Sequence, residues 1–489
     1  MTKNPRPAED LVNGGSSFPK RTMASPLPLW LTVAATAAVV WCPGQSMAAG
    51  PPGPVSLTLI PPSPVTDKIF LDIRGAVWNQ GAAAKSFDVT VFLDQEDSAN
   101  VLHSESLHLG PGLCKGTKFR WATDGHAGHH TLLLVAKSDV NTYRITQPIE
   151  ILASDVRSTR RIDGAWFEFY HWSEAEGKPW NEEIRKTTDG QWKEMVAAMH
   201  RIGMDLVIVQ EVFRNQEYVG KHSMETDGYT GRAYYPSKLY PQRRDIAATD
   251  PLGAVLAEAD KHGMHVMVGV GCYAWFDFTP GSLAWHKRVA DELWEQYGHH
   301  RSFYGWYVSE EIPGHLGAGT ARRREIVRFF REFKEHVNTL APDKPVMLAT
   351  NCHCVAQSEG YYPKLLEHLD ILCPFGFHRM PAGDYSGDEV ARMLQQHCDQ
   401  AGAHLWMDME VFVFGRGNAL LPRPIDGVID DLMRFPDFEK ICCYAFTGLM
   451  NSPDQSRKPG GKATVRLYND YRKLVLQARN SESGPEPKN

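Results

Sequence analysis

The feature that most restricts the fold of this chain is a short pattern that recurs at three places. At residues 202–206, 262–266 and 401–405, a helical segment passes through glycine, one further residue and a polar residue into a hydrophobic strand. Glycine ends a helix in the left-handed conformation without the steric cost that a side chain would add. The repetition therefore predicts successive units of one helix and one strand.

Eight hydrophobic runs of strand length alternate with helical segments. They are residues 164–170, 205–212, 265–273, 303–311, 345–350, 371–377, 404–412 and 440–448. Eight parallel strands close a TIM barrel, and no glycine fingerprint of an open dinucleotide-binding sheet follows the first run. The sequence therefore predicts an α/β fold with a (β/α)8 TIM barrel, expected as the catalytic domain, at residues 160–478. The polar residues 479–489 predict a disordered tail.

A different pattern precedes the barrel. Between residues 65 and 153, short runs of alternating apolar and polar residues are separated by turn residues, which is typical of a β-sandwich. Residues 77–81, 87–94 and 128–139 resemble bacterial immunoglobulin-like adhesion-type domains. The resemblance implies a small all-β immunoglobulin-like domain, a spacer or a sugar-binding accessory, and we expect a spacer. The Pro- and Gly-rich residues 49–64 predict a linker.

The N-terminal segment has the pattern of a secretory signal peptide. Lys20 and Arg21 precede an apolar run over residues 27–41, and small residues at 46–48 fit a cleavage site. The run is about 15 residues long, which is short for a transmembrane helix, so an uncleaved anchor is the less favoured alternative. We therefore predict a signal peptide at residues 1–48, a secreted or periplasmic protein, and no membrane span after signal removal.

Charge and cysteine content narrow the possible ligands. The formal net charge of −6 disfavours a nucleic-acid partner, because nucleic-acid binding depends on neutralising phosphates. Cys352, His353 and Cys354 could ligate a metal, but no second Cys/His pair stands at zinc-finger spacing. We expect packing at the end of a strand to be the role of these three residues.

Active sites of TIM barrels lie at the C-terminal ends of the strands, so the polar and aromatic residues that end each run are the candidates. Glu311 ends the fourth run and Glu410 ends the seventh, and these two are the predicted catalytic residues. The predicted substrate-binding residues are Glu168, Gln210, Tyr273, Trp275, Glu310, His378, Asp408 and Tyr444.

Two carboxylates that face each other across a barrel mouth are typical of glycoside hydrolysis, which needs a proton donor and a nucleophile or base. Both glutamates follow apolar runs, so burial could raise the pKa of one of them enough for a general acid. Glu310 competes with Glu311, but Glu311 shares the strand phase of Tyr307 and Ser309 and lies nearer the mouth. This chemistry requires no metal and no organic cofactor.

Five stretches resemble a bacterial family of uncharacterised TIM-barrel domains grouped near the glycosidases. They are residues 164–168, 203–210, 233–237, 305–311 and 408–410. The last two also resemble the strand-four and strand-seven endings of the large retaining-glycosidase clan, in which Asn usually precedes the acid/base Glu. Glu310 occupies that place here. The resemblance implies glycoside hydrolase activity on a carbohydrate substrate.

Three hypotheses follow for the function. The first is a secreted retaining glycoside hydrolase that uses Glu311 as acid/base and Glu410 as nucleophile. The second is a non-catalytic carbohydrate-binding or scaffold protein on a TIM-barrel fold, because a fold does not establish catalysis. The third is a metal hydrolase that uses Cys352, His353 and Cys354 or His378.

Overall fold

The computed structural model describes residues 53–482 except residues 215–230, 241 and 272–276. The predicted signal peptide lies outside the described residues. Eight parallel strands close into a barrel in the order β9, β10, β13, β14, β15, β16, β17, β20 and back to β9. Their bounds are β9 Gly164–Phe167, β10 Leu206–Val209, β13 His265–Gly269, β14 Phe303–Ile312, β15 Val346–Thr350, β16 Ile371–Leu372, β17 His404–Glu410 and β20 Lys440–Tyr444. The predicted (β/α)8 TIM barrel is confirmed.

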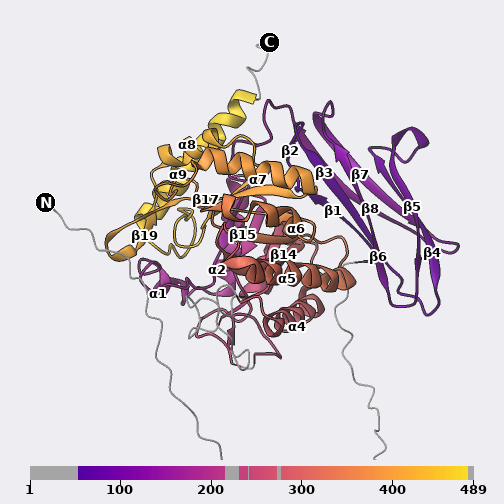
Figure 1. Ribbon diagram of the computed structural model, residues 1–489, viewed down its shortest axis with the longest axis horizontal. Coiled ribbons are helices and arrows are strands. Elements are labelled where there is room, and N and C mark those ends of the chain that lie inside the picture. Colours follow the sequence, from indigo (N-terminus) through magenta and orange to yellow (C-terminus); the bar gives the residue numbers. More distant parts are fainter. Residues whose placement is uncertain (1–52, 215–230, 241, 272–276, 483–489) are drawn as a thin grey trace, which may run out of the picture. The chain divides into compact units, whose positions relative to one another are not determined.

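A helix follows every barrel strand and covers the outside of the barrel (Figure 1). These helices are α2 Asp189–Arg201, α3 Pro251–His262, α4 Pro280–Tyr297, α5 Gly319–Leu340, α6 Tyr362–Leu366, α7 Gly387–Ala401, α8 Ile425–Arg434 and α9 Lys462–Glu482. A short helix, α1 Asn181–Ile184, precedes α2. Helix α9 runs past residue 478, where a disordered tail was predicted to begin. Throughout the described part of the chain, each helix is too short or too polar to cross a bilayer.

The helix ends explain why the units repeat. Gly263 and Gly402 adopt the left-handed conformation, with φ of 67° and 71°, at the ends of α3 and α7. At the other end of α3, the Asp250 side chain accepts a hydrogen bond from the Gly253 N–H, and Pro251 occupies the first turn. The two glycine caps turn the chain from α3 into β13 and from α7 into β17.

The N-terminal region is a β-sandwich of two sheets, drawn in indigo and purple in Figure 1. The strands of one sheet are β1 Val55–Ile60, β3 Phe70–Trp78 and β6 Cys114–Ala122, and those of the other are β2 Val65–Thr66, β8 Thr142–Leu152, β7 Gly128–Lys137, β4 Lys85–Leu93 and β5 Val101–Leu109. The prediction of a linker at residues 49–64 is wrong for residues 55–60. Those residues form β1 because Val55, Leu57 and Leu59 alternate into the sandwich core.

The sandwich contacts the N-terminal ends of the barrel strands. The Tyr304 hydroxyl of β14 donates a hydrogen bond of 2.7 Å to the carbonyl of Leu59. The Arg74 guanidinium of β3 pairs at 2.6 Å with Asp370, which directly precedes β16. Lys440, the first residue of β20, donates to the Pro64 carbonyl at 2.5 Å. This end of the barrel is therefore occupied by protein, and ligands have access at the opposite end.

Candidate active site

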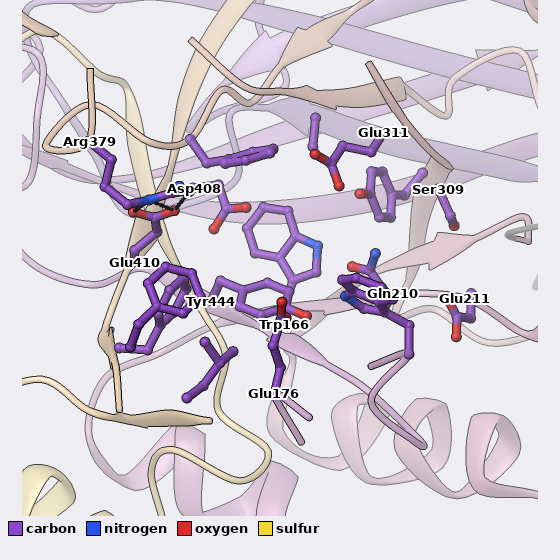
Figure 2. A pocket seen from close by; sticks show the side chains of 17 residues that line it. Trp166, Glu176, Gln210, Glu211, Ser309, Glu311, Arg379, Asp408, Glu410 and Tyr444 are labelled. Carbon is purple, nitrogen blue, oxygen red and sulfur yellow. Dashed lines mark hydrogen bonds and ion pairs between the residues drawn. The ribbon is translucent and has the colours of Figure 1, made fainter. Parts of the chain in front are cut away.

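A pocket opens at the C-terminal ends of the barrel strands, where TIM barrels carry their active sites. Five of the predicted site residues line it, and they come from four strands or the turns that follow them (Figure 2). They are Gln210, Glu311, Asp408, Glu410 and Tyr444. In Figure 2, Glu311 and Glu410 lie on different sides of the pocket. The fold thus brings together two carboxylates that are distant in the sequence.

Strand β14 presents Glu311 to the pocket. Tyr307, Ser309 and Glu311 all line the pocket, as alternate residues of one strand face. The register between β14 and β15 shifts between Val308 and Ile312, which is the irregularity of a β-bulge, and Ile312 pairs again with Thr350. Glu310 is fully buried and does not line the pocket, and its carboxylate lies 3.9 Å from the His286 imidazole of α4. The prediction that Glu310 binds substrate is therefore at odds with where its side chain lies.

The surroundings of Glu311 favour its protonated form. Desolvation by the surrounding protein raises the pKa of Glu311 to about 7, and the charges of Glu176 and Glu410 add to the rise. The Arg379 guanidinium opposes the rise but does not cancel it. The side chain still contacts the pocket, since it is only partly buried. Glu311 can therefore hold a proton near neutral pH and deliver it to a bound ligand.

Glu410, the last residue of β17, has two basic partners. The Arg379 Nε lies 2.9 Å from each carboxylate oxygen, and the Arg379 Nη2 also donates to this carboxylate. His378 Nε2 lies 3.1 Å from the same group. His378 does not line the pocket, so it supports Glu410 and has no surface there for a substrate. Two fixed partners orient the carboxylate, as a nucleophile requires.

Asp408, on the same strand as Glu410, is another carboxyl residue that lines the pocket. Burial raises its pKa well above the ordinary value, and the nearby charges of Glu410 and Glu311 raise it further. A buried aspartic acid that stays neutral at pH 7 can donate a hydrogen bond from its carboxyl group. Asp408 is therefore suited to binding a ligand oxygen or supporting a neighbouring carboxylate.

A chain of hydrogen bonds runs beneath the pocket and ends at two of its lining residues. The Tyr444 hydroxyl donates to Glu168 at 2.5 Å, and His171 Nδ1 lies 2.7 Å from the other Glu168 oxygen. His171 Nε2 lies 3.1 Å from the Glu176 carboxylate. Burial would lower the pKa of His171, but Glu168 and Glu176 together raise it to about 9. Glu168 is thus a buried member of this network and does not line the pocket.

Two predicted residues, Tyr273 and Trp275, lie outside the described residues. The lining residues that sequence reasoning did not select as site residues are Trp166, Trp172, Glu176, Glu211, Tyr307, Ser309, Ala349, Phe375, Arg379, Phe412, Phe414 and Leu420. Arg379 directly follows His378, and its place after the sixth run was a usable signal. Glu176, Phe414 and Leu420 come from loops or a hairpin whose local sequence carries no period to place them.

Polar atoms on the pocket wall are left without protein partners. Within the described residues, the Oγ of Ser309, Oδ1 of Asp408 and Oε1 of Gln210 make no hydrogen bond. Buried polar atoms are normally paired, so these three are groups that a polar ligand could satisfy. Ser309 and Asp408 are almost fully buried, which makes their unpaired atoms the more informative.

The segment considered for metal binding is engaged in packing contacts. Cys352 is buried and its sulfur lies 3.2 Å from the Met380 sulfur, and the Cys354 N–H donates to Asp384 at 2.7 Å. Over the part of the chain that the structure describes, no cluster of three or more His, Cys, Asp or Glu side chains has an arrangement that could hold a metal ion. The metal-hydrolase hypothesis gains no support from this segment.

Several solved structures share parts of this architecture. A candidate α-L-fucosidase from Bacteroides thetaiotaomicron is 20% identical, with a TM-score of 0.47 over 65% of this chain and 93% of that chain. β-Glucuronidase 2 from Bacteroides uniformis is 13% identical, with a TM-score of 0.39 over 86% of this chain and 50% of that chain. A β-galacturonidase from Eisenbergiella tayi is 11% identical, with a TM-score of 0.36 over 83% of this chain and 69% of that chain.

At such low identities and TM-scores, these likenesses do not bear on the activity of this chain. No curated protein matches its sequence. One family model does match, and it covers residues 162–457, which is the barrel and more than half of the chain. The chain therefore belongs to the family described as Domain of unknown function (DUF4434).

Proposed function

We propose that this protein is a glycoside hydrolase that cleaves glycosidic bonds of an oligo- or polysaccharide with two carboxylates. The observation that carries the proposal is the contrast between Glu311 and Glu410 in one pocket. One carboxyl group has a pKa raised to about 7, and the other is paired with an arginine that is always charged. Glycoside hydrolysis needs such a pair, one a proton donor and the other an ionised group.

The roles follow from these surroundings. Glu311 gives its proton to the glycosidic oxygen as the bond between that oxygen and the anomeric carbon breaks. The Glu410 carboxylate attacks the same carbon and forms a glycosyl ester, so the leaving sugar departs as an alcohol. The ionised Glu311 then takes a proton from water, whose oxygen displaces Glu410 and releases the second sugar. The anomeric configuration is retained after two displacements.

The rest of the pocket wall also suits a sugar. A sugar presents hydroxyl groups at its edge and C–H groups on its faces, so it needs hydrogen-bonding groups beside flat apolar surfaces. The unpaired atoms of Gln210, Ser309 and Asp408 supply the first. The rings of Trp166, Trp172, Phe375, Phe412, Phe414 and Tyr444 supply the second.

Isosteric substitution tests the two roles. Glu311→Gln and Glu410→Gln should each lower kcat on an aryl-glycoside panel by about a thousandfold or more, with the circular dichroism spectrum unchanged. Glu310→Gln is the matched control, since it changes the neighbouring carboxylate on the opposite strand face, and it should keep turnover within a few-fold. Proton NMR of the first product would reveal whether configuration is retained.

Two other results would count against this function. Wild-type-like activity in either variant would remove that residue from the reaction. Oligosaccharide binding without release of reducing ends over long incubation would favour the non-catalytic carbohydrate-binding alternative instead.

The placement of the protein in the cell and its domain plan belong to the same proposal. They comprise a signal peptide at residues 1–48, a mature protein that is secreted or periplasmic, an immunoglobulin-like character for the sandwich at 65–153 and a catalytic domain at 160–478. The basic and apolar pattern at residues 20–41 supports export. Fractionation of expressing bacteria and N-terminal sequencing of the mature chain test it, and full-length protein in the cytoplasm would contradict it.

A further inference from the structure

A two-stranded hairpin extends the pocket wall beyond β17. Its strands are β18 Phe412–Phe414 and β19 Leu420–Pro422, which pair with Phe414 opposite Leu420 and Val413 opposite Leu421. Successive residues of a strand face opposite sides, so every second residue shares a face. Phe412, Phe414 and Leu420 accordingly face the pocket and line it, whereas Val413 and Leu421 do not line it. The hairpin thus has one face that belongs to the pocket and one that does not.

Phe414 is the exposed member of the pocket face. Half of its surface, 50%, remains open to solvent although it lines the pocket, whereas Phe412 is 7% exposed and Leu420 1%. The ring is held at 5.4 Å from the Phe412 ring, edge to face, and the Arg379 guanidinium lies 5.8 Å from its centre. A fixed and half-exposed ring gains free energy when a ligand covers its apolar face.

A polar group of the same pocket is fixed on the loop that is bonded to this hairpin. The Leu420 N–H donates a 3.0 Å hydrogen bond to the Glu176 carbonyl, which joins the hairpin to the loop that carries Trp172 and Glu176. The Glu176 carboxylate lines the pocket and is held from behind by His171 at 3.1 Å. The two segments therefore form one continuous wall, with an apolar ring and a carboxylate that can accept hydrogen bonds.

From this wall we infer a second sugar subsite beside the reaction centre, in which an uncharged pyranose lies on Phe414 and donates hydroxyl hydrogen bonds to Glu176. The inference rests on the proposed function, because it makes the substrate an oligosaccharide that occupies at least two subsites. An uncharged sugar is the expected occupant. The Glu176 carboxylate on this wall would repel an anionic sugar. The Arg379 guanidinium near the Phe414 ring is already paired with Glu410, so it does not offset that repulsion.

Binding to the full chain carrying Glu311→Gln tests the subsite without turnover. Isothermal titration would compare methyl glycosides with di- to hexasaccharides of the gluco, manno, xylo and galacto series. The expected result is tighter binding of an oligosaccharide than of its methyl monosaccharide. A second substitution, Phe414→Ala, should weaken the oligosaccharide about tenfold and leave the monosaccharide unchanged, and Phe414→Trp should restore the affinity.

Val413→Ala is the matched control, because Val413 is an adjacent, exposed apolar residue of the same hairpin that does not line the pocket. It should leave both affinities unchanged. Affinity that does not increase with chain length, or that Phe414→Ala leaves unchanged, would overturn the subsite. So would dimerisation of the wild type that Phe414→Ala abolishes, since the ring would then cover a second copy.

The test separates this inference from the proposed function. If the oligosaccharide binds through Phe414 but the wild-type protein never cleaves it, the subsite stands and hydrolysis fails. If the wild type cleaves aryl glycosides but its KM for oligosaccharides is unaffected by Phe414→Ala, hydrolysis stands and the subsite fails.

Discussion

The two ends of the barrel both hold buried or half-buried carboxyl groups, and the surroundings of these groups are opposite. At the N-terminal end, burial alone would raise the pKa of Asp370, but the charges and hydrogen bonds of Arg74 and Lys334 hold it well below its ordinary value. At the C-terminal end, desolvation raises the pKa of Glu311 to about 7 and that of Asp408 well above its usual range. The same kind of side chain is therefore ionised at one end and able to keep a proton at the other.

Under the proposed function, this difference separates residues that stabilise the fold from residues that take part in the reaction. The sandwich supplies Arg74 and Asp72 to the N-terminal end, where carboxylates and cations satisfy one another away from water. At the C-terminal end Ser309 and Asp408 line the pocket, and each has a polar atom that makes no hydrogen bond within the described residues. Residues at the first end should therefore affect unfolding, and residues at the second should affect turnover and ligand binding.

The largest effect is expected at the N-terminal end. Arg74 is 3% exposed and pairs with both Asp72 and Asp370, so Arg74→Met would leave two buried carboxylates short of positive charge. The free energy of unfolding in urea should fall by about 3–5 kcal/mol. Turnover per folded molecule should be unchanged. Arg144→Met, at an exposed ion pair with Glu96 in the same sandwich, is the control and should not alter unfolding.

A loss of less than about 1 kcal/mol in Arg74→Met would contradict this comparison. It would mean that the buried ion pairs of Arg74 do not stabilise the junction between the sandwich and the barrel.

The second effect concerns His404, which lies at the junction between the carboxylates of Glu439, at 2.6 Å, and Asp72, at 3.8 Å. Burial would lower its pKa, but these two carboxylates raise it from 6.5 to about 9. The folded state therefore binds this proton more tightly than the unfolded chain does. The stability that results is fully present below pH 6.5 and is lost as the pH rises through about 9.

His404→Gln should thus cost about 2–3 kcal/mol at pH 6, because the protonated imidazole is removed, and much less at pH 10. Urea unfolding of wild type and variant across this pH range measures the difference. A cost that is independent of pH would mean that the charge of His404 does not stabilise the junction.

The third effect is the counterpart at the C-terminal end. The pKa of Glu311 rises from 4.5 in the unfolded chain to about 7 in the fold, so ionising this group works against the folded state. That penalty is absent below pH 4.5 and complete above pH 7. Glu311→Gln should therefore stabilise the protein by about 1–2 kcal/mol at pH 8 and leave it unchanged near pH 4. This stabilisation is smaller than the full pKa shift would give, because the Glu311 side chain is partly exposed and solvent screens its charge.

Thermal unfolding of the variant should be measured at the two pH values and compared with its turnover. Greater stability at pH 8 together with lower turnover would mean that the ionisable Glu311 lowers stability where the proposed reaction needs it. A variant that is less stable than wild type at pH 8 would contradict the assigned surroundings of Glu311.

The sequence was sufficient to predict the barrel and the presence of Glu311 and Glu410 at its C-terminal end, because both depend on local signals. Glycine at 203, 263 and 402 marks helix ends, and Glu311 and Glu410 end apolar runs. Strand lengths were harder, as the sixth run shows. Residues 371–377 are hydrophobic throughout, but only Ile371 and Leu372 pair as a strand, and Phe375 forms isolated bridges beyond it. Hydrophobicity reports burial, and burial does not require strand pairing.

The remaining parts of the site could not be predicted because they depend on tertiary contacts. Arg379 acquires its role only when the turn after β16 reaches Glu410, and Glu176 only when His171 and the hairpin fix its loop. The Pro- and Gly-rich composition of residues 49–64 concealed β1, whose partner strand β3 begins at Phe70. Contacts of this range leave no period in the local sequence.

The smallest expected effect compares one hydroxyl at each end. The Thr58 Oγ1 in the sandwich donates to Asp343 at 2.6 Å and accepts from Lys344 at 3.1 Å, so Thr58→Val should cost about 1–2 kcal/mol of unfolding free energy. Ser309 is equally buried, but its Oγ has no partner among the described residues. Ser309→Ala should therefore change the free energy of unfolding by less than about 0.5 kcal/mol and instead weaken oligosaccharide binding several-fold. Equal losses of stability in the two variants would mean that the Ser309 hydroxyl is satisfied inside the protein and does not await a ligand.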